Sequence, residues 1–86
     1  MEKNISENII VNISDNVTII EVSKVTQKFE SEIYLIKDVN GMVHEINLKS
    51  FLGLINLRLK NGDHITVKAI GDDSDIALKE VIQYLS

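Results

Sequence analysis

The hydrophobic residues of this chain repeat with two different periods, and the period predicts the element in each segment. Apolar and polar positions alternate in Ile9–Ile13, Met42–Leu48 and His64–Ala69, as they do in strands with one buried face. Ile33–Ile36 is predicted as a further strand. The turn Asp38–Gly41 joins it to Met42–Leu48, because Asn-Gly readily takes the positive φ angles of a hairpin.

The stretch Val17–Phe29 carries two conflicting signals. Its many β-branched residues have low helix propensity. Its apolar residues nevertheless fall at steps of three and four, which place them on one face of a helix: Ile19, Val22, Val25, Thr26 and Phe29. We let the period outweigh the propensity and predict a helix.

Two more helices are predicted from capping residues and apolar stripes. Ser50 is a suitable N-cap for a helix over Phe51–Arg58, which is apolar on almost every side. A last helix begins after Asp72–Ser74 and buries a stripe that runs from Leu78 to Leu85. The predicted order is βαββαβα, which defines an α+β open-faced sandwich with the helices on one face of an antiparallel sheet.

Composition excludes several classes of protein. The chain has 86 residues, enough for a single domain over residues 1–86, and its 44% hydrophobic content is that of a folded protein. A net charge of −4 argues against nucleic-acid binding. The absence of cysteine excludes disulfides, thiolate metal sites and a cysteine nucleophile. With no signal-peptide pattern and no membrane-spanning run, a cytoplasmic protein without membrane contact is expected.

Four segments resemble, in the right order, the HPr family, the phosphocarriers of the bacterial sugar phosphotransferase system. They are Phe29–Leu35, Asn47–Leu54, Lys60–Ala69 and Gly71–Leu78. The resemblance implies a four-stranded antiparallel sheet with three helices on one face, in agreement with the predicted order. The stretch from Tyr34 to Ile46 is longer than is usual in the family, so its hairpin is expected to protrude.

The chain departs from the family between the first strand and the first helix. HPr proteins carry a Gly-[Leu/Ile]-His-Ala-Arg-Pro stretch there, and its histidine accepts the phosphoryl group. The segment Ile13–Thr18 has no histidine, arginine, proline or glycine. Asp15 falls near the histidine's place. It is expected to be a loop or cap carboxylate, with an aspartyl phosphate or a fixed-charge mimic of phosphohistidine as alternatives.

Ser50 is the family site that this chain retains. In HPr proteins of many Gram-positive bacteria, and in a relative without the histidine, the matching serine is phosphorylated by an HPr kinase. The phosphorylated form then binds a transcriptional regulator. A phosphate at a helix N-terminus meets free N–H groups and a favourable dipole. The alternative is that Ser50 acts only as an N-cap.

The two histidines are the remaining nitrogen acceptors for a phosphoryl group. His44 lies on the core side of the predicted alternation, so we expect it to be partly buried and structural. His64 shares a face with Thr66 and Lys68 and should be solvated. Neither histidine has the further ligands that a metal site needs, and no cofactor is indicated.

The helix Phe51–Arg58 is too apolar to be buried completely against one sheet, so part of it should face outward. Leu52 and Ile55 are the expected outward residues, beside Ile20 and Lys24 of the first helix. In the HPr family this surface binds protein partners. The alternative is an ordinary surface leucine or a crystal or dimer contact.

The prediction is a regulatory docking module without a catalytic residue, not an enzyme, with the HPr kinase, phosphotransferase-system enzymes or a transcriptional regulator as partners. A phosphocarrier with a substitute acceptor is the first alternative. A structural subunit of a multicomponent enzyme is the second.

Overall fold

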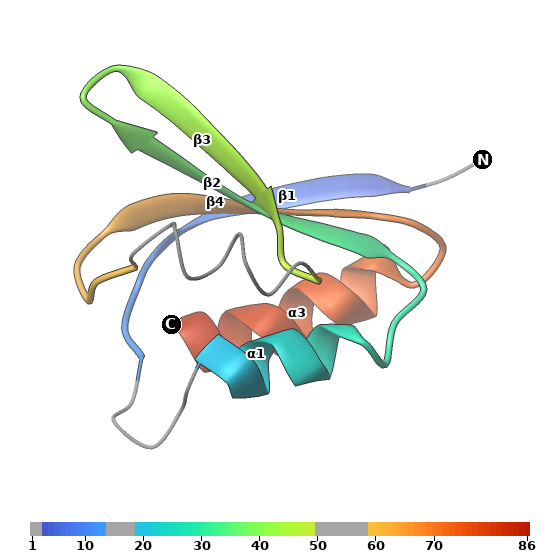
Figure 1. Ribbon diagram of the computed structural model, residues 1–86. Helices are drawn as coiled ribbons and strands as arrows, with labels where there is room; N and C mark the ends of the chain where they lie inside the picture. The colour runs from blue at the N-terminus through green and yellow to red at the C-terminus, as the bar shows by residue number, and fades with distance from the viewer. Residues whose placement is uncertain (1–2, 14–18, 50–58) are drawn as a thin grey trace.

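The computed structural model describes residues 3–13, 19–49 and 59–86 (Figure 1). In chain order the described elements are β1 Asn4–Ile10, α1 Ile19–Thr26, β2 Glu32–Val39, β3 Met42–Asn47, β4 His64–Ile70 and α3 Ser74–Leu85. The predicted helix over Phe51–Arg58 lies outside the described residues.

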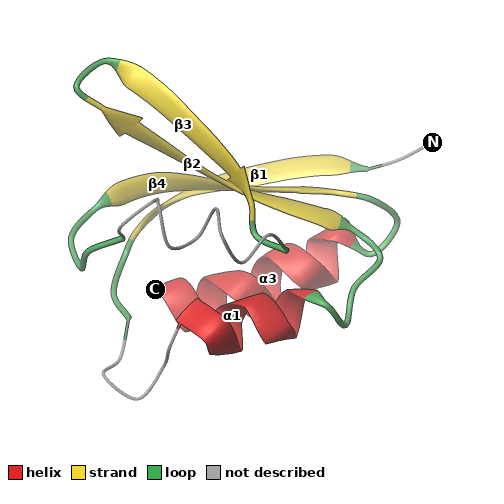
Figure 2. Ribbon diagram, viewed as in Figure 1, coloured by secondary structure: helices red, strands yellow, loops and turns green. Residues whose placement is uncertain are grey.

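The strands form one antiparallel sheet in the order β1-β4-β2-β3. Both described helices, α1 and α3, lie against the same face of this sheet, and the described residues place no helix on its other face (Figure 2). The α+β open-faced sandwich expected from the hydrophobic pattern is therefore confirmed for these elements.

The core lies between the sheet and the two helices. The alternation in β2 and β4 turns Ile33, Leu35 and Val67 inward, where they are fully buried. From the helices, Val22 and Val81 pack into the same cluster. Each such side chain contributes roughly 1.5–3 kcal/mol of hydrophobic stabilisation, so the layers are held together mainly by these few residues.

The first strand begins and ends earlier than its predicted bounds, Ile9–Ile13. Its pairing with β4 ends at Ile10, opposite His64. The N-terminal half was missed because only Ile5 and Ile9 of this edge strand pack toward the core. Val11 is buried although it follows the strand, so the apolar pattern marked core residues rather than strand residues.

The helix predicted over Val17–Phe29 is present as α1. Val22, Val25 and Thr26 are buried, as their spacing predicts. After Thr26 the backbone continues in tighter turns, because the N–H groups of the next three residues bond to carbonyls only three positions back. The helical period was therefore the correct signal, and packing overrode the poor propensity.

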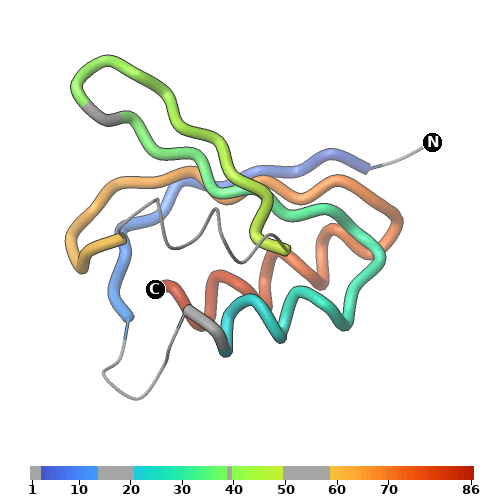
Figure 3. The backbone as a smooth tube through the Cα atoms, in the orientation of Figure 1, coloured from blue at the N-terminus to red at the C-terminus, as the bar shows by residue number. Residues whose placement is uncertain are grey.

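The hairpin formed by β2 and β3 projects beyond the helix layer, as expected (Figure 3). Its turn has positive φ at Asn40 (54°) and at Gly41 (82°). The prediction that His44 is partly buried is wrong. This residue is exposed, because the outer part of the hairpin has no described helix beneath it.

Candidate functional site

The segment that follows β1 leads toward the place where HPr proteins carry their histidine, and the structure fixes its start. Val11 donates its N–H to the carbonyl of Asp63 at 2.8 Å, and Asn12 donates to the carbonyl of Leu85 at 2.7 Å. The Asn61 side chain accepts from the Ile13 N–H at 2.7 Å and donates to the Ile13 carbonyl at 3.3 Å. This segment is thus tied to the turn before β4 and to the end of α3.

The turn before β4 is stabilised by Asp63. One carboxylate oxygen of Asp63 accepts from the Lys60 N–H at 2.9 Å and from the Lys37 ammonium at 2.8 Å. The hydrogen bond from Lys37 is the main reason that the pKa of Asp63 lies below its ordinary value, and the Lys60 N–H adds to it. The ion pair is largely shielded, with side chains 15% and 22% exposed, so it fixes the turn against β2.

The residues just before Ser50 are also fixed. Leu48 is buried and donates its N–H to the carbonyl of Ile33 at 2.7 Å. Lys49 reaches across to the carbonyl of Phe29 at 2.9 Å, which ties the end of β3 to the loop after α1. The chain therefore enters the Ser50 region from a defined position beside α1.

A third anchor joins the loop after α1 to the start of α3. Asp73 accepts from the N–H of Glu30 at 3.0 Å and from the N–H of Ser31 at 2.9 Å, and the Ser31 hydroxyl also donates to it. The bond from this hydroxyl is the first cause of the lowered pKa of Asp73. Sequence reasoning gave Asp73 to a helix cap, but its side chain makes no cap hydrogen bond.

The structure places only some of the predicted site residues. Asp15, Ser50, Leu52 and Ile55 lie outside the described ranges. Ile20 is part of α1, and its side chain is not described.

Two further residues are placed by their exposure. Lys24 is exposed on α1, and His64 is exposed at the start of β4, as its alternation predicts. His44 lies on β3 and His64 on β4, so neither belongs to α1.

Sequence reasoning missed the anchoring residues Asn61, Asp63 and Asp73. Their turn-forming types were recognised, but the pattern carries no sign of a partner 48 residues away, as Asn61 has, or 42 residues away, as Asp73 has. Within the described part of the chain, no group of three His, Cys, Asp or Glu side chains is placed to hold a metal ion. None of the described helices is long and apolar enough to cross a membrane.

The antiparallel strand order and the described helices on one face of the sheet define an HPr-like α+β sandwich. The family described as "PTS HPr component phosphorylation site" matches residues 18–86. The chain belongs to this HPr family. The match begins at residue 18 and does not include Asp15.

Two relatives show the same relationship in sequence. The phosphocarrier protein HPr of Mycoplasma pneumoniae is 43% identical over 54 residues, which cover 63% of this chain and 58% of that protein. The HPr-like protein Crh of Bacillus subtilis is 33% identical over 58 residues, covering 67% of this chain and 64% of that protein. The aligned part thus spans less than two-thirds of either relative.

Two solved structures share the fold. The phosphocarrier protein HPr from Bacillus anthracis superposes with a TM-score of 0.82 at 21% identity, covering 96% of this chain and 98% of that one. HPr-C-His from Thermoanaerobacter tengcongensis gives a TM-score of 0.74 at 20% identity, covering 93% and 89%. At these identities the likeness concerns the fold alone.

Proposed function

We propose that this protein is a regulatory docking module of the phosphotransferase system that no longer carries phosphate on a histidine. The observation that carries the proposal is membership of the HPr family combined with a segment, Ile13–Thr18, that has no histidine. The whole chain acts as one domain in the cytoplasm, with a third helix over Phe51–Arg58. Its partners are proteins, with no nucleic acid and no membrane.

The proposed control site is Ser50. The sequence around it resembles the family's regulatory serine, and the preceding residues are firmly held through Leu48 and Lys49. Phosphorylation at a helix N-terminus adds roughly −1.5 to −2 charges, which the N–H groups and helix dipole there stabilise. Phosphorylated Ser50 would then be recognised by a transcriptional regulator.

Incubation with ATP and an HPr kinase tests this site. We expect one phosphate, seen by intact mass and absent from Ser50→Ala but retained in Ser6→Ala, an exposed serine on β1. Ser50→Ala should also lower the free energy of unfolding by about 0.5–2 kcal/mol, since it removes an N-cap. Destabilisation without any phosphorylation of the native chain would leave Ser50 a structural cap.

The proposed docking surface combines Ile20 and Lys24 with Leu52 and Ile55. Its support is the exposed position of Lys24 on α1 and the apolar excess of Phe51–Arg58. Lys24→Glu should weaken binding of the partner, whereas Lys79→Glu on α3, the matched exposed control, should not. Leu52→Asp should cost about 2 kcal/mol or more of binding free energy if this residue is a hot spot. Equal effects of both lysine variants would contradict the assignment.

The alternative function is a phosphocarrier with a substitute acceptor. His64 is its best candidate, because it is exposed and pairs with Ile10 at the end of β1, the strand that precedes the segment Ile13–Thr18 in sequence. Phosphate on His64 after incubation with enzyme I and phosphoenolpyruvate would favour this alternative.

A further inference from the structure

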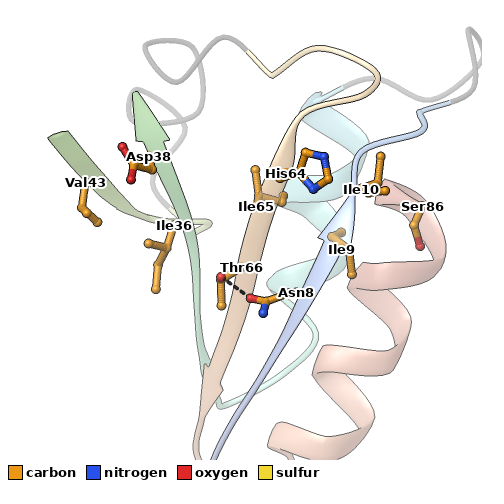
Figure 4. A pocket seen from close by; sticks show the side chains of 10 residues that line it. All are labelled: Asn8, Ile9, Ile10, Ile36, Asp38, Val43, His64, Ile65, Thr66 and Ser86. Carbon is orange, nitrogen blue, oxygen red and sulfur yellow. Dashed lines mark hydrogen bonds between the residues drawn. The ribbon is translucent and has the colours of Figure 1, made fainter. Parts of the chain in front are cut away.

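The helix-free face of the sheet carries a hollow that the proposed docking surface does not use. Its volume is about 650 Å³, and it opens where the β2–β3 hairpin diverges from β4 (Figure 4). Its lining includes Ile10, Ile36, Val43 and the polar pair of Asn8 and Thr66, joined by a 2.5 Å hydrogen bond. The lining therefore combines apolar side chains with this hydrogen-bonded pair and with Asp38, His64 and Ser86.

The apolar residues at the rim are exposed in one copy of the chain. Ile10 is 55% exposed and Val43 is 67% exposed. The alternation of a one-sided sheet predicts polar residues at the outward positions Ile10 and Val43. Together with Ile36 they form an apolar patch, as interaction sites do.

One outward side chain from each of the four strands forms a row across the hollow. Ile10 pairs with His64 on one side, and Asp38 pairs with Val43 on the other. The ladder between β2 and β4 ends one position earlier, at Lys37 and Ile65. Across the face the order is apolar, histidine, aspartate, apolar.

Two copies of this row are complementary when their sheets face each other across a two-fold axis. The axis runs parallel to the strands and passes between β4 and β2. The axis places β4 over β2 of the second copy and β1 over β3. His64 then faces Asp38 of the second copy, and Ile10 faces Val43, with each contact made twice. The strands of the two sheets remain aligned, which is the common packing of two sheets face to face.

A further outward row, beyond that of Thr66 and Ile36, fits the same arrangement. Lys68 and Tyr34 are opposite one another in the ladder, and the Lys68 ammonium lies 5.1 Å from the centre of the Tyr34 ring. The axis turns each lysine toward the tyrosine of the other copy as well. Lys68 is balanced locally by Glu45 at 3.3 Å, so this part of the face does not add to the repulsion expected from the net charge of −4.

The shape of the sheet agrees with the same axis. The hairpin rises on the side of β3, whereas the sheet stays low on the side of β1 (Figure 1). A two-fold related copy therefore puts its raised hairpin above the low edge of the first. Each hairpin can cover the hollow of its partner.

We propose that the helix-free face is the interface of a symmetric dimer of this chain, in which Ile10 and His64 of one copy meet Val43 and Asp38 of the other. The interface is formed from the sheet alone and leaves the helix layer, with its proposed regulatory site, accessible. The patch is small, so the dimer should form at high protein concentration.

Cysteine cross-linking tests the geometry directly, because the native chain has no cysteine. Ile10→Cys and Val43→Cys are mixed and treated with a short bis-maleimide. The crossed product should exceed both self-linked products, since the axis keeps the two copies of residue 10, and the two copies of residue 43, apart. A statistical mixture of products, or none, would overturn the proposal.

Sedimentation equilibrium at millimolar concentration tests the energetics. The native chain should show a dimer, and Ile10→Asp should weaken it at least tenfold. Ile76→Asp, at a 61% exposed position on α3, should leave it unchanged. Asp38→Asn should weaken it while keeping the turn, because Asn retains the acceptor used by the Gly41 N–H. A monomer at all concentrations, or equal loss in Ile10→Asp and Ile76→Asp, contradicts the interface.

Discussion

At the scale of single residues, Gly71 shows how tightly two distant loops meet. A Cβ atom at Gly71 would lie 2.5 Å from the hydroxyl oxygen of Ser31 and 2.7 Å from its Cα. Ser31 is fully buried and held by Asp73, so it has little room to move. Gly71 also has a positive φ of 147°, which a residue with a side chain rarely adopts.

Gly71→Ala should therefore lower the free energy of unfolding more than Gly62→Ala does. Gly62 also has a positive φ, 94°, but a Cβ there would meet no atom within 4 Å. Gly62→Ala measures the backbone strain, about 1 kcal/mol, whereas Gly71→Ala adds an overpacking cost of about 1–3 kcal/mol. Urea denaturation of both variants gives the difference. Equal changes in the free energy of unfolding would show that the loop at Ser31 moves aside without a measurable cost.

At the scale of elements, α1 tests whether packing or propensity forms the helix. Its β-branched residues disfavour a helix, but Val22 and Val25 are buried against the core. Val22→Ala improves helix propensity and removes buried methyl groups, so the two effects oppose each other.

Val22→Ala should lower the free energy of unfolding by about 1–3 kcal/mol, because the loss of packing exceeds the gain in propensity. Lys24→Ala, on the exposed side of α1, should change it by less than about 0.5 kcal/mol. Chemical denaturation of both variants is the measurement. A stabilised Val22→Ala would mean that propensity, not burial, limits this helix.

The same elements show how far sequence reasoning reached. Periodicity found α1, α3 and the β2–β3 hairpin, because burial on one face leaves a regular pattern. It misplaced β1, where a half-covered edge strand has few inward apolar residues. It predicted a partly buried His44 because the alternation shows which face of a strand points toward the core. It does not show how far along the strand the helices cover that face.

The candidate site was less accessible to such reasoning. The family segments identified Ser50 and the missing histidine, which are local in sequence. The anchors made by Asn61, Asp63 and Asp73 depend on residues brought together by folding, and no local pattern encodes these partners. The hollow on the helix-free face likewise arises from the divergence of the hairpin from β4.

At the scale of the whole molecule, the two anchoring carboxylates predict a loss of stability in acid. Asp63 and Asp73 both have native pKa values below the ordinary 3.8. Above that value both residues are ionised in either state, and their stabilisation is complete. As the pH falls below it, the unfolded chain binds protons first, so the free energy of unfolding decreases until the native pKa is passed.

Urea denaturation at about pH 6 and about pH 3 should show this decrease. The double variant Asp63→Asn, Asp73→Asn should be less stable than the native chain at the higher pH and should depend less on pH. A native chain with the same free energy of unfolding at both pH values would show that the two anchors do not stabilise the fold.

We propose that this member of the HPr family no longer performs the phosphocarrier step. The most direct measurement is the intact mass of the native chain, at neutral pH, after incubation with enzyme I and phosphoenolpyruvate, beside an HPr with its histidine as positive control. We expect an unchanged mass for this chain and one added phosphate for the control. A stoichiometric, acid-labile phosphate on this chain, removed by His64→Ala or His44→Ala, would contradict it.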